Sequence, residues 1–147
     1  MKAAFFLLTL GLGIILAVHL AMNGRVGAAV QNTQMANALF WCIGAVTAIL
    51  VGFTAWEPEF FGRLQDVNPW LFTAGMMGAL LVFAIAALIP KVGAGGLFMS
   101  LLAGQVITAM VLSHFGWLGS PEQPITLVKA LGVVLMLGGA AMVTFVD

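Results

Sequence analysis

Residues 67–121 read VNPWLFTAGMMGALLVFAIAALIPKVGAGGLFMSLLAGQVITAMVLSHFGWLGSP and contain a single charged side chain, that of Lys91. A membrane-spanning helix needs about 20 apolar residues, because each residue adds only about 1.5 Å to its length. The uncharged runs on either side of Lys91, 67–90 and 92–121, are each long enough for one such helix. Strands of membrane barrels run about 10 residues with strict alternation, and these continuous runs do not alternate. This stretch therefore predicts two transmembrane helices in an all-α fold.

The rest of the chain continues the pattern, with further uncharged runs at 3–24, 26–56 and 130–146. We therefore predict one polytopic five-helix transmembrane domain over residues 1–147. Pro90 is expected to end the third span, because proline cannot continue a helix without losing a backbone donor. The five spans are predicted at 3–23, 33–56, 69–90, 93–116 and 125–146.

The composition excludes several other classes of protein. Hydrophobic residues make up 63% of the chain and charged residues 7%, with a mean hydropathy of +1.15, whereas a soluble domain is about 25% charged. Five basic and five acidic residues leave no net charge, so we expect no nucleic acid as a partner. The single cysteine, Cys42, cannot form an internal disulfide.

The basic residues bear on the orientation of the chain in the membrane. Five spans place Lys2, Arg63 and Lys129 on one side and Arg25 and Lys91 on the other. The positive-inside rule works through an excess of Lys and Arg in cytoplasmic loops, and three against two is hardly an excess. Either one residue and the insertion machinery fix a single orientation, or the chain inserts in both.

An odd number of spans makes dual topology relevant to function. Transporters commonly pair two inverted halves, with the binding site at their interface. Two copies of this chain inserted head to tail would form a ten-helix inverted-repeat transporter as an antiparallel dimer. Trp56, Trp70 and Trp117 all fall on one predicted side, and the second copy would supply the belt of tryptophans on the other.

The ionisable residues argue against catalysis. No Asp or Glu lies inside a predicted span, so a buried carboxylate of the kind that proton-coupled exporters use is missing. His19 and His114 lie far apart with no acid near either in sequence, and two histidines with one cysteine do not form a convincing metal site. We therefore expect no enzyme activity, no metal and no cofactor.

Uncharged polar side chains and one histidine within or near the spans remain as candidates for binding a substrate. The predicted binding residues are Gln105, Trp41, Asn37, His19, Asn23 and Thr108. His19 and Asn23 are four positions apart and share a helix face, as do Asn37 and Trp41.

Each candidate also has a structural interpretation. A buried amide often only bridges two helices, at about 0.6 kcal/mol, although Gln105 lies at mid-membrane depth, where a primary amide is costly. Histidine at position 19 could simply lie near water at the interface. Trp41 could pack in the core, or it could stack on a flat or cationic ligand.

Small residues recur at helical spacing in four of the spans, where they would let helices approach closely. They could serve general packing, or form faces that slide during transport. The predicted packing glycines are Gly44, Gly52, Gly75, Gly104, Gly132, Gly138 and Gly139.

Several short segments carry a family resemblance. They are NGRVG at 23–27, IPKVGA at 89–94, AGQ at 103–105, SHFGWLG at 113–119, and Gly132 with GGA at 138–140. Together these segments resemble the five-helix, YdcZ-type branch of the drug/metabolite transporter superfamily. The chain departs from that pattern at His19, where glutamine is usual, and at Ser113, where an acid usually precedes His114. The acid's absence removes a partner for His114, and His19 adds an imidazole where the pattern has an amide.

The resemblance implies an inner-membrane transporter made of two five-helix halves. The partner would be a second, antiparallel copy or a related five-helix chain, and the substrate a small organic molecule. We expect alternating access at a midplane cavity between two inverted copies. The alternatives are an uncoupled facilitator and a non-transporting membrane scaffold or accessory subunit.

Overall fold

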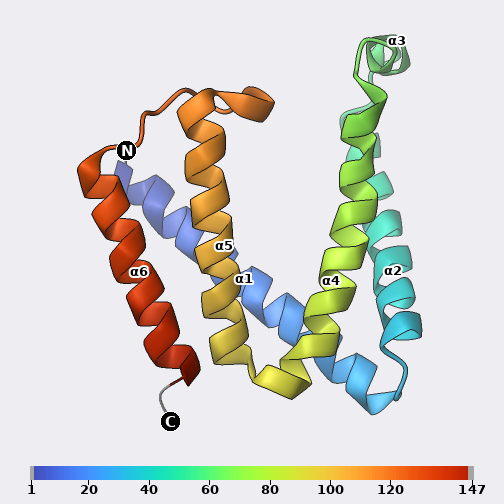
Figure 1. Ribbon diagram of the computed structural model, residues 1–147. Coiled ribbons are helices and arrows are strands. Elements are labelled where there is room, and N and C mark those ends of the chain that lie inside the picture. The colour runs from blue at the N-terminus through green and yellow to red at the C-terminus, as the bar shows by residue number, and fades with distance from the viewer. Residues whose placement is uncertain (1, 146–147) are drawn as a thin grey trace. The chain divides into compact units, whose positions relative to one another are not determined.

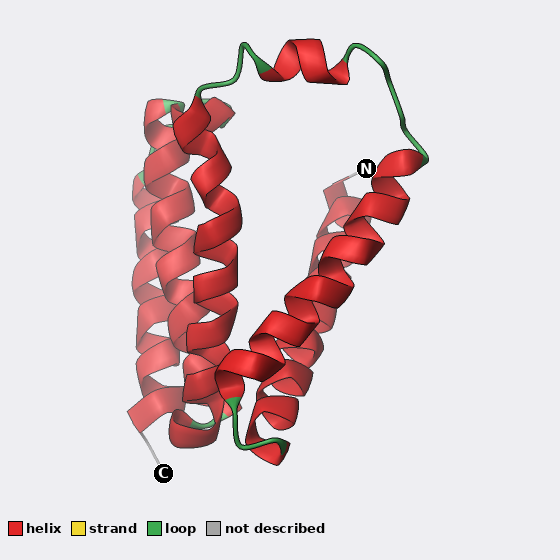
Figure 2. Cartoon of the chain, turned by 90° about the vertical axis from the view of Figure 1, so that its right-hand side faces the viewer, coloured by secondary structure: helices red, strands yellow, loops and turns green. Residues whose placement is uncertain are grey.

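The computed structural model describes residues 2–145. Within this range every regular element is a helix and no strand is present (Figure 2), as predicted. The chain divides into two compact units, Met1–Lys91 and Val92–Asp147. Each unit is described below by itself.

Five helices in the described range are long and apolar enough to cross a membrane, which confirms the predicted number of spans. For the second to fifth spans, both ends lie within three residues of the predicted positions. The largest difference is at the end of the second span, which is predicted at 56 and observed at Phe53. The candidate spans are Ala3–Ala29, Thr33–Phe53, Pro69–Val92, Ala94–Phe115 and Leu127–Phe145.

The first unit contains three long helices and two short ones. They are α1 (Lys2–Ala29), α2 (Thr33–Phe53), α3 (Phe60–Leu64), the 3₁₀ helix η1 (Pro69–Phe72) and α4 (Thr73–Val92). The chain ascends α2, turns through α3 and returns along α4 (Figure 1). The first part of α2 contacts α4, where the Asn37 Nδ2 donates to the Ala79 carbonyl, and the two helices diverge toward α3 (Figure 2). Figure 1 also shows that α1 ends next to the start of α2.

Helix α1 is longer than its predicted span, 3–23, and continues through Arg25 to Ala29. It turns into α2 at once, and Asn32 caps α2 by accepting a hydrogen bond from the Met35 backbone N–H at 3.0 Å. The side chain of Arg25 stays exposed, so the helix carries its charge past the apolar stretch without burying it. A charge therefore marked the end of the apolar run, not the end of the helix.

Helix α4 runs through Pro90 to Val92, so the prediction that Pro90 ends this helix is wrong. Proline has no N–H to donate to the carbonyl of Ala86 four residues earlier. The helix tolerates this loss because it ends two residues later, where Gly93 adopts a φ of +77°.

The second unit is a helical hairpin of α5 (Ala94–Phe115), the 3₁₀ helix η2 (Trp117–Gly119) and α6 (Leu127–Phe145). The start of α5 packs on the end of α6, where a β-carbon at Gly96 would lie 3.4 Å from the Thr144 side chain. At its other end α5 stops at Gly116, whose φ of +64° is left-handed and therefore suits glycine.

Candidate functional site

The core of the first unit is small and has a polar residue within it. Asn23 of α1 is fully buried, and both amide atoms, Oδ1 and Nδ2, lack a hydrogen-bond partner among the described residues. The apolar members of this core are Leu20, Ala36, Ile85 and Ala86. A buried amide without partners costs about 1–3 kcal/mol, so the position of Asn23 is not explained by packing alone.

The residue after Asn23 explains how close α1 comes to α4. A β-carbon at Gly24 would lie 3.5 Å from the Ala86 carbonyl oxygen and 3.5 Å from the Ile89 side chain. The same carbonyl has lost its usual helical donor, because position 90 is proline. The unpaired amide of Asn23 is thus next in sequence to the glycine that approaches the Ala86 carbonyl. We call this contact between Asn23–Gly24 and Ala86–Pro90 the α1–α4 junction.

Asn37 and Trp41, one turn apart on α2, contact adjacent residues of α4. The Asn37 Nδ2 donates to the Ala79 carbonyl at 3.3 Å, while its Oδ1 is buried without a partner in the part of the chain that the structure describes. The Trp41 ring lies 3.5 Å from where a β-carbon of Gly78 would be, and 40% of Trp41 is exposed. This pair thus joins α2 to α4 and leaves one amide oxygen and part of an indole free.

The other predicted binding residues lie on exposed positions. His19 is exposed on α1, one turn before Asn23, and Gln105 and Thr108 are exposed on α5. Asn23, Asn37 and Trp41 all belong to the first unit, whereas Gln105 and Thr108 belong to the second. The binding role of all six residues stays a prediction.

The close helix contacts fall on glycines other than the predicted packing glycines. A β-carbon at Gly44, Gly52, Gly75, Gly104, Gly132, Gly138 or Gly139 would meet nothing within 4 Å. The glycines whose β-carbon would instead meet another helix or a loop are Gly24, Gly27, Gly78, Gly95, Gly96 and Gly116. None of the seven predicted packing glycines lies at a close helix contact within the described part of its own unit. Their role in packing therefore stays a prediction.

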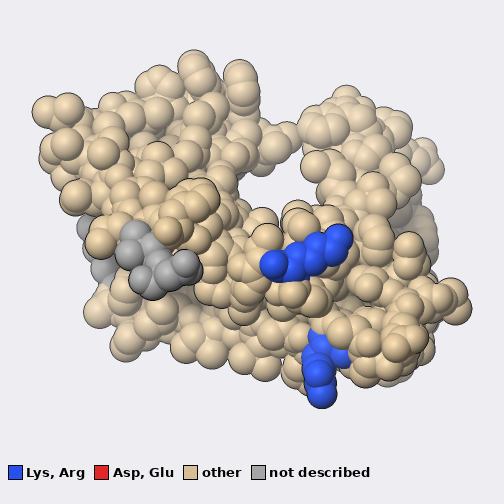
Figure 3. All heavy atoms as spheres, turned by 60° about the horizontal axis from the view of Figure 1, so that its bottom comes forward, with Lys and Arg blue, Asp and Glu red and all other residues tan. Residues whose placement is uncertain are grey.

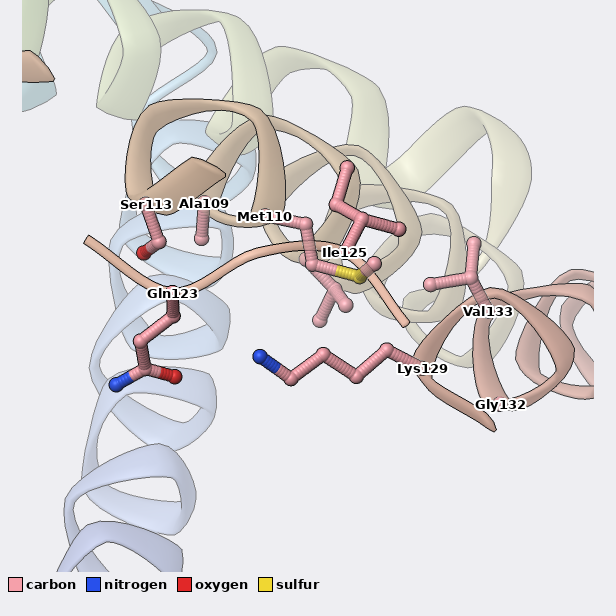
Figure 4. Close-up of a pocket in the computed structure, with 9 residues that line it drawn as sticks. Ala109, Met110, Ser113, Gln123, Ile125, Lys129, Gly132 and Val133 are labelled. Atoms are coloured by element: carbon pink, nitrogen blue, oxygen red, sulfur yellow. The ribbon is translucent and has the colours of Figure 1, made fainter. Parts of the chain in front are cut away.

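A pocket of about 440 Å³ lies between α5 and α6 near the loop that joins them, and sequence reasoning did not anticipate it. Apolar side chains form most of its wall, and three polar ones gather toward one end (Figure 4). The lining residues are Val106, Ala109, Met110, Ser113, Gln123, Ile125, Lys129, Gly132 and Val133. We call this space the α5–α6 pocket.

The loop before α6 is held against α5 by hydrogen bonds that form one end of the α5–α6 pocket. The Gln123 N–H donates to the Ser113 carbonyl at 2.8 Å, and the Ile125 N–H donates to Nδ1 of His114 at 3.2 Å. Since Nδ1 accepts, the proton of the neutral imidazole is assigned to Nε2. The Lys129 ammonium donates to the Pro124 carbonyl at 3.2 Å, which fixes the cation beside the pocket.

The segment between α2 and α4 is rich in aromatic side chains. Trp56 stacks on Phe53 and meets Phe61 edge to face, and Glu57 forms an ion pair with Arg63. These rings help to line a second pocket, of about 370 Å³. Aromatic and charged residues of this kind are typical of a helix connection at the membrane–water boundary.

Five apolar helices without an intervening soluble domain define a multi-pass membrane protein in the described range. A family model described as "Putative inner membrane exporter, YdcZ" (DMT_YdcZ) matches residues 4–142. The chain therefore belongs to this family, and it is a multi-pass protein of the inner membrane, which confirms the resemblance seen in its short motifs. No curated protein matches the chain, and neither does any solved structure.

Proposed function

We propose that the chain is one five-helix half of an exporter of small organic molecules. Two copies inserted in opposite orientations would form the complete transporter, with alternating access to a site between them. The family assignment supports export across the inner membrane, and the proposal adds the substrate class and the antiparallel pair.

The observation that carries this proposal is the unpaired amide of Asn23. It is fully buried, and nothing among the described residues pairs with its Oδ1 or Nδ2. A scaffold that only packed in lipid would gain from an apolar residue at this position. A substrate or a second copy could supply the hydrogen bonds that the single chain does not.

The chemistry of the neighbouring groups favours a neutral or weakly polar amphipathic substrate. Asn37 keeps a buried oxygen without a partner, and Trp41 offers part of an indole surface. Amides fix a ligand through hydrogen bonds and the indole through stacking, as in pockets that combine apolar walls with a few polar groups.

The basic residues support insertion in both orientations. Figure 3 looks onto the end at which α1 and α4 finish; basic side chains stand out there and no acidic side chain is visible. Arg25 and Lys91 lie near these two helix ends, whereas Arg63 follows α2 and Lys129 opens α6. Because both ends of the spans carry basic residues, the positive-inside rule gives no strong preference for one orientation.

Export is tested by the uptake of radiolabelled chloramphenicol, a neutral amphipathic probe, into everted inner-membrane vesicles. We expect uptake above vesicles without the protein, and an initial rate at least tenfold lower for Asn23→Leu. The matched control is Thr47→Val, since the Thr47 hydroxyl is exposed and bonds only the Ile43 carbonyl of its own helix. Wild-type rates in a folded Asn23→Leu protein, or no uptake by the wild type, would contradict the proposal.

The antiparallel pair is tested by labelling single cysteines at each terminus, in cells, with a membrane-impermeant reagent and in a Cys42→Ser background. Labelling of each terminus in about half of the molecules supports two copies of opposite orientation. One uniform orientation removes the homodimer and points to an oppositely inserted related chain as the partner.

An uncoupled facilitator is the second candidate, because the five spans of the described range contain no Asp or Glu. Export would then persist when the proton gradient is collapsed by an uncoupler. A dependence on the gradient that disappears in His19→Gln would instead indicate coupling through this histidine.

A further inference from the structure

The polar end of the α5–α6 pocket combines the Lys129 ammonium with two neutral polar side chains, those of Gln123 and Ser113. Lys129 gives one ammonium hydrogen to the Pro124 carbonyl and keeps two. In Figure 4 the Lys129 ammonium faces the amide oxygen of Gln123, whose nitrogen points away from Lys129, and the Ser113 hydroxyl lies on the Gln123 side of the pocket. No acidic residue is among the nine that line it. This end of the pocket is therefore positively charged.

The nearest acidic residue in sequence points elsewhere. Glu122 precedes Gln123, but its side chain lies over Gly116, where a β-carbon would come within 2.8 Å of Glu122 Cγ. Glu122 does not line the pocket. The Lys129 charge is accordingly not neutralised by a carboxylate within the pocket.

The remaining wall is apolar and extends along the helices. Val106 and Met110 of α5 and Val133 of α6 line it, together with Ala109 and Ile125. The lining positions of α5 run from 106 to 113, which corresponds to about 10 Å of helix. A volume of about 440 Å³ lies within the range of pockets that hold drug-sized ligands.

We propose that the α5–α6 pocket binds an amphipathic monoanion, with its acidic headgroup at Lys129, Gln123 and Ser113 and its apolar chain along Val106, Met110 and Val133. One cation matches one negative charge, the Ser113 hydroxyl adds a neutral donor, and the Gln123 amide adds a second when its side chain rotates so that its nitrogen faces the headgroup. The headgroup could belong to a free amphiphile or to an anionic phospholipid, which share this chemistry. The inference goes beyond the proposed function, since it concerns one copy and a different substrate class.

Binding is tested with radiolabelled laurate and the purified full-length protein in dodecyl maltoside. We expect saturable binding to the wild type and an affinity about tenfold or more lower in Lys129→Gln, the usual effect of losing a charged hydrogen bond. Lys129→Arg should retain binding. The matched control is Lys91→Gln, which removes an exposed cation of the first unit and should leave laurate affinity unchanged.

A second variant tests the apolar wall independently of charge. A β-carbon at Gly132 would meet nothing within 4 Å, so Gly132→Leu adds its side chain without a clash at its base and fills the pocket. We expect this variant to lose laurate binding while its circular dichroism and melting temperature stay close to wild type. Laurate affinity unchanged in Lys129→Gln or in Gly132→Leu, or reduced equally in Lys91→Gln, would overturn the proposal.

Native mass spectrometry of protein extracted from membranes distinguishes the two sources of the headgroup. Phosphatidylglycerol retained by the wild type and lost in Lys129→Gln would identify the lipid as the natural ligand. Laurate binding without retained phosphatidylglycerol would identify a free amphiphile. A wild-type protein that binds neither would overturn the inference, whatever the outcome of the chloramphenicol assay.

Discussion

Replacing Asn23 by leucine is expected to stabilise the protein. Leucine has the same branched shape but no polar atoms, and both polar atoms of Asn23 are buried without partners in the described chain. An unsatisfied buried amide costs about 1–3 kcal/mol. Leucine is larger than asparagine, and fitting it beside Gly24, which contacts α4, will offset part of that gain. We therefore expect the free energy of unfolding to rise by about 1 kcal/mol.

The measurement is unfolding of the purified protein, without added substrate, by increasing mole fractions of sodium dodecyl sulfate in dodecyl maltoside, followed by circular dichroism. Asn37→Leu is the matched control, because it also removes an amide from the first unit. Asn37 donates to the Ala79 carbonyl at 3.3 Å, and such interhelical bonds are worth about 0.6 kcal/mol. The control should therefore gain less stability than Asn23→Leu.

A marked loss of stability in Asn23→Leu would refute this reasoning, because the cost of fitting the larger side chain would then exceed the cost of the unpaired amide. A gain of stability together with a loss of export would show that Asn23 serves export and not the packing of the helices. Residues that bind substrate commonly cost stability in this way.

Three other substitutions test details of the fold. Gly116→Ala should lower the free energy of unfolding by about 1–2 kcal/mol, because the φ of Gly116 is +64° and the new β-carbon would lie 2.8 Å from Glu122 Cγ. In thermal melts, adding Glu122→Ala should recover the part of this loss that comes from the clash and leave the part that comes from φ. Gly78→Ala should change stability little, because its β-carbon would lie 3.5 Å from the Trp41 ring, whereas Gly78→Leu should displace the ring and shift the emission of a variant with Trp41 as its only tryptophan. His114→Phe should remove the acceptor that holds the loop before α6 and speed amide hydrogen exchange in residues 120–126, with wild-type exchange rates counting against that role.

The sequence was sufficient to predict the spans because charge and apolar length are what a bilayer selects. It did not predict where α1 ends, because a charged side chain such as Arg25 can lie on a helix that continues beyond the apolar run. The helix ends at Ala29, just before Gln31 adopts a φ of +53°. The α1–α4 junction could not be located either. The helices are apolar on most faces, so hydropathy does not reveal which face meets a neighbour.

The α5–α6 pocket illustrates the same limit for a binding site. Its polar end depends on a loop that folds back onto α5 through His114 and Ser113, and no spacing in the sequence specifies that fold. A partial signal was present, because Ser113 and His114 belong to a motif that carried the family resemblance. The pairing of this motif with Gln123 and Lys129 appears only in three dimensions.

The α1–α4 junction combines signals that are far apart in the sequence. Pro90 removes the helical donor of the Ala86 carbonyl, and Gly24 lets α1 come close to that carbonyl. Asn23 directly precedes Gly24 in the sequence, and its side chain is buried with its amide unpaired among the described residues. A bilayer offers no water to satisfy such groups, so we expect their partners to arrive with a substrate or a second copy. Export, rather than folding, is therefore the property expected to fail first when Asn23 is replaced.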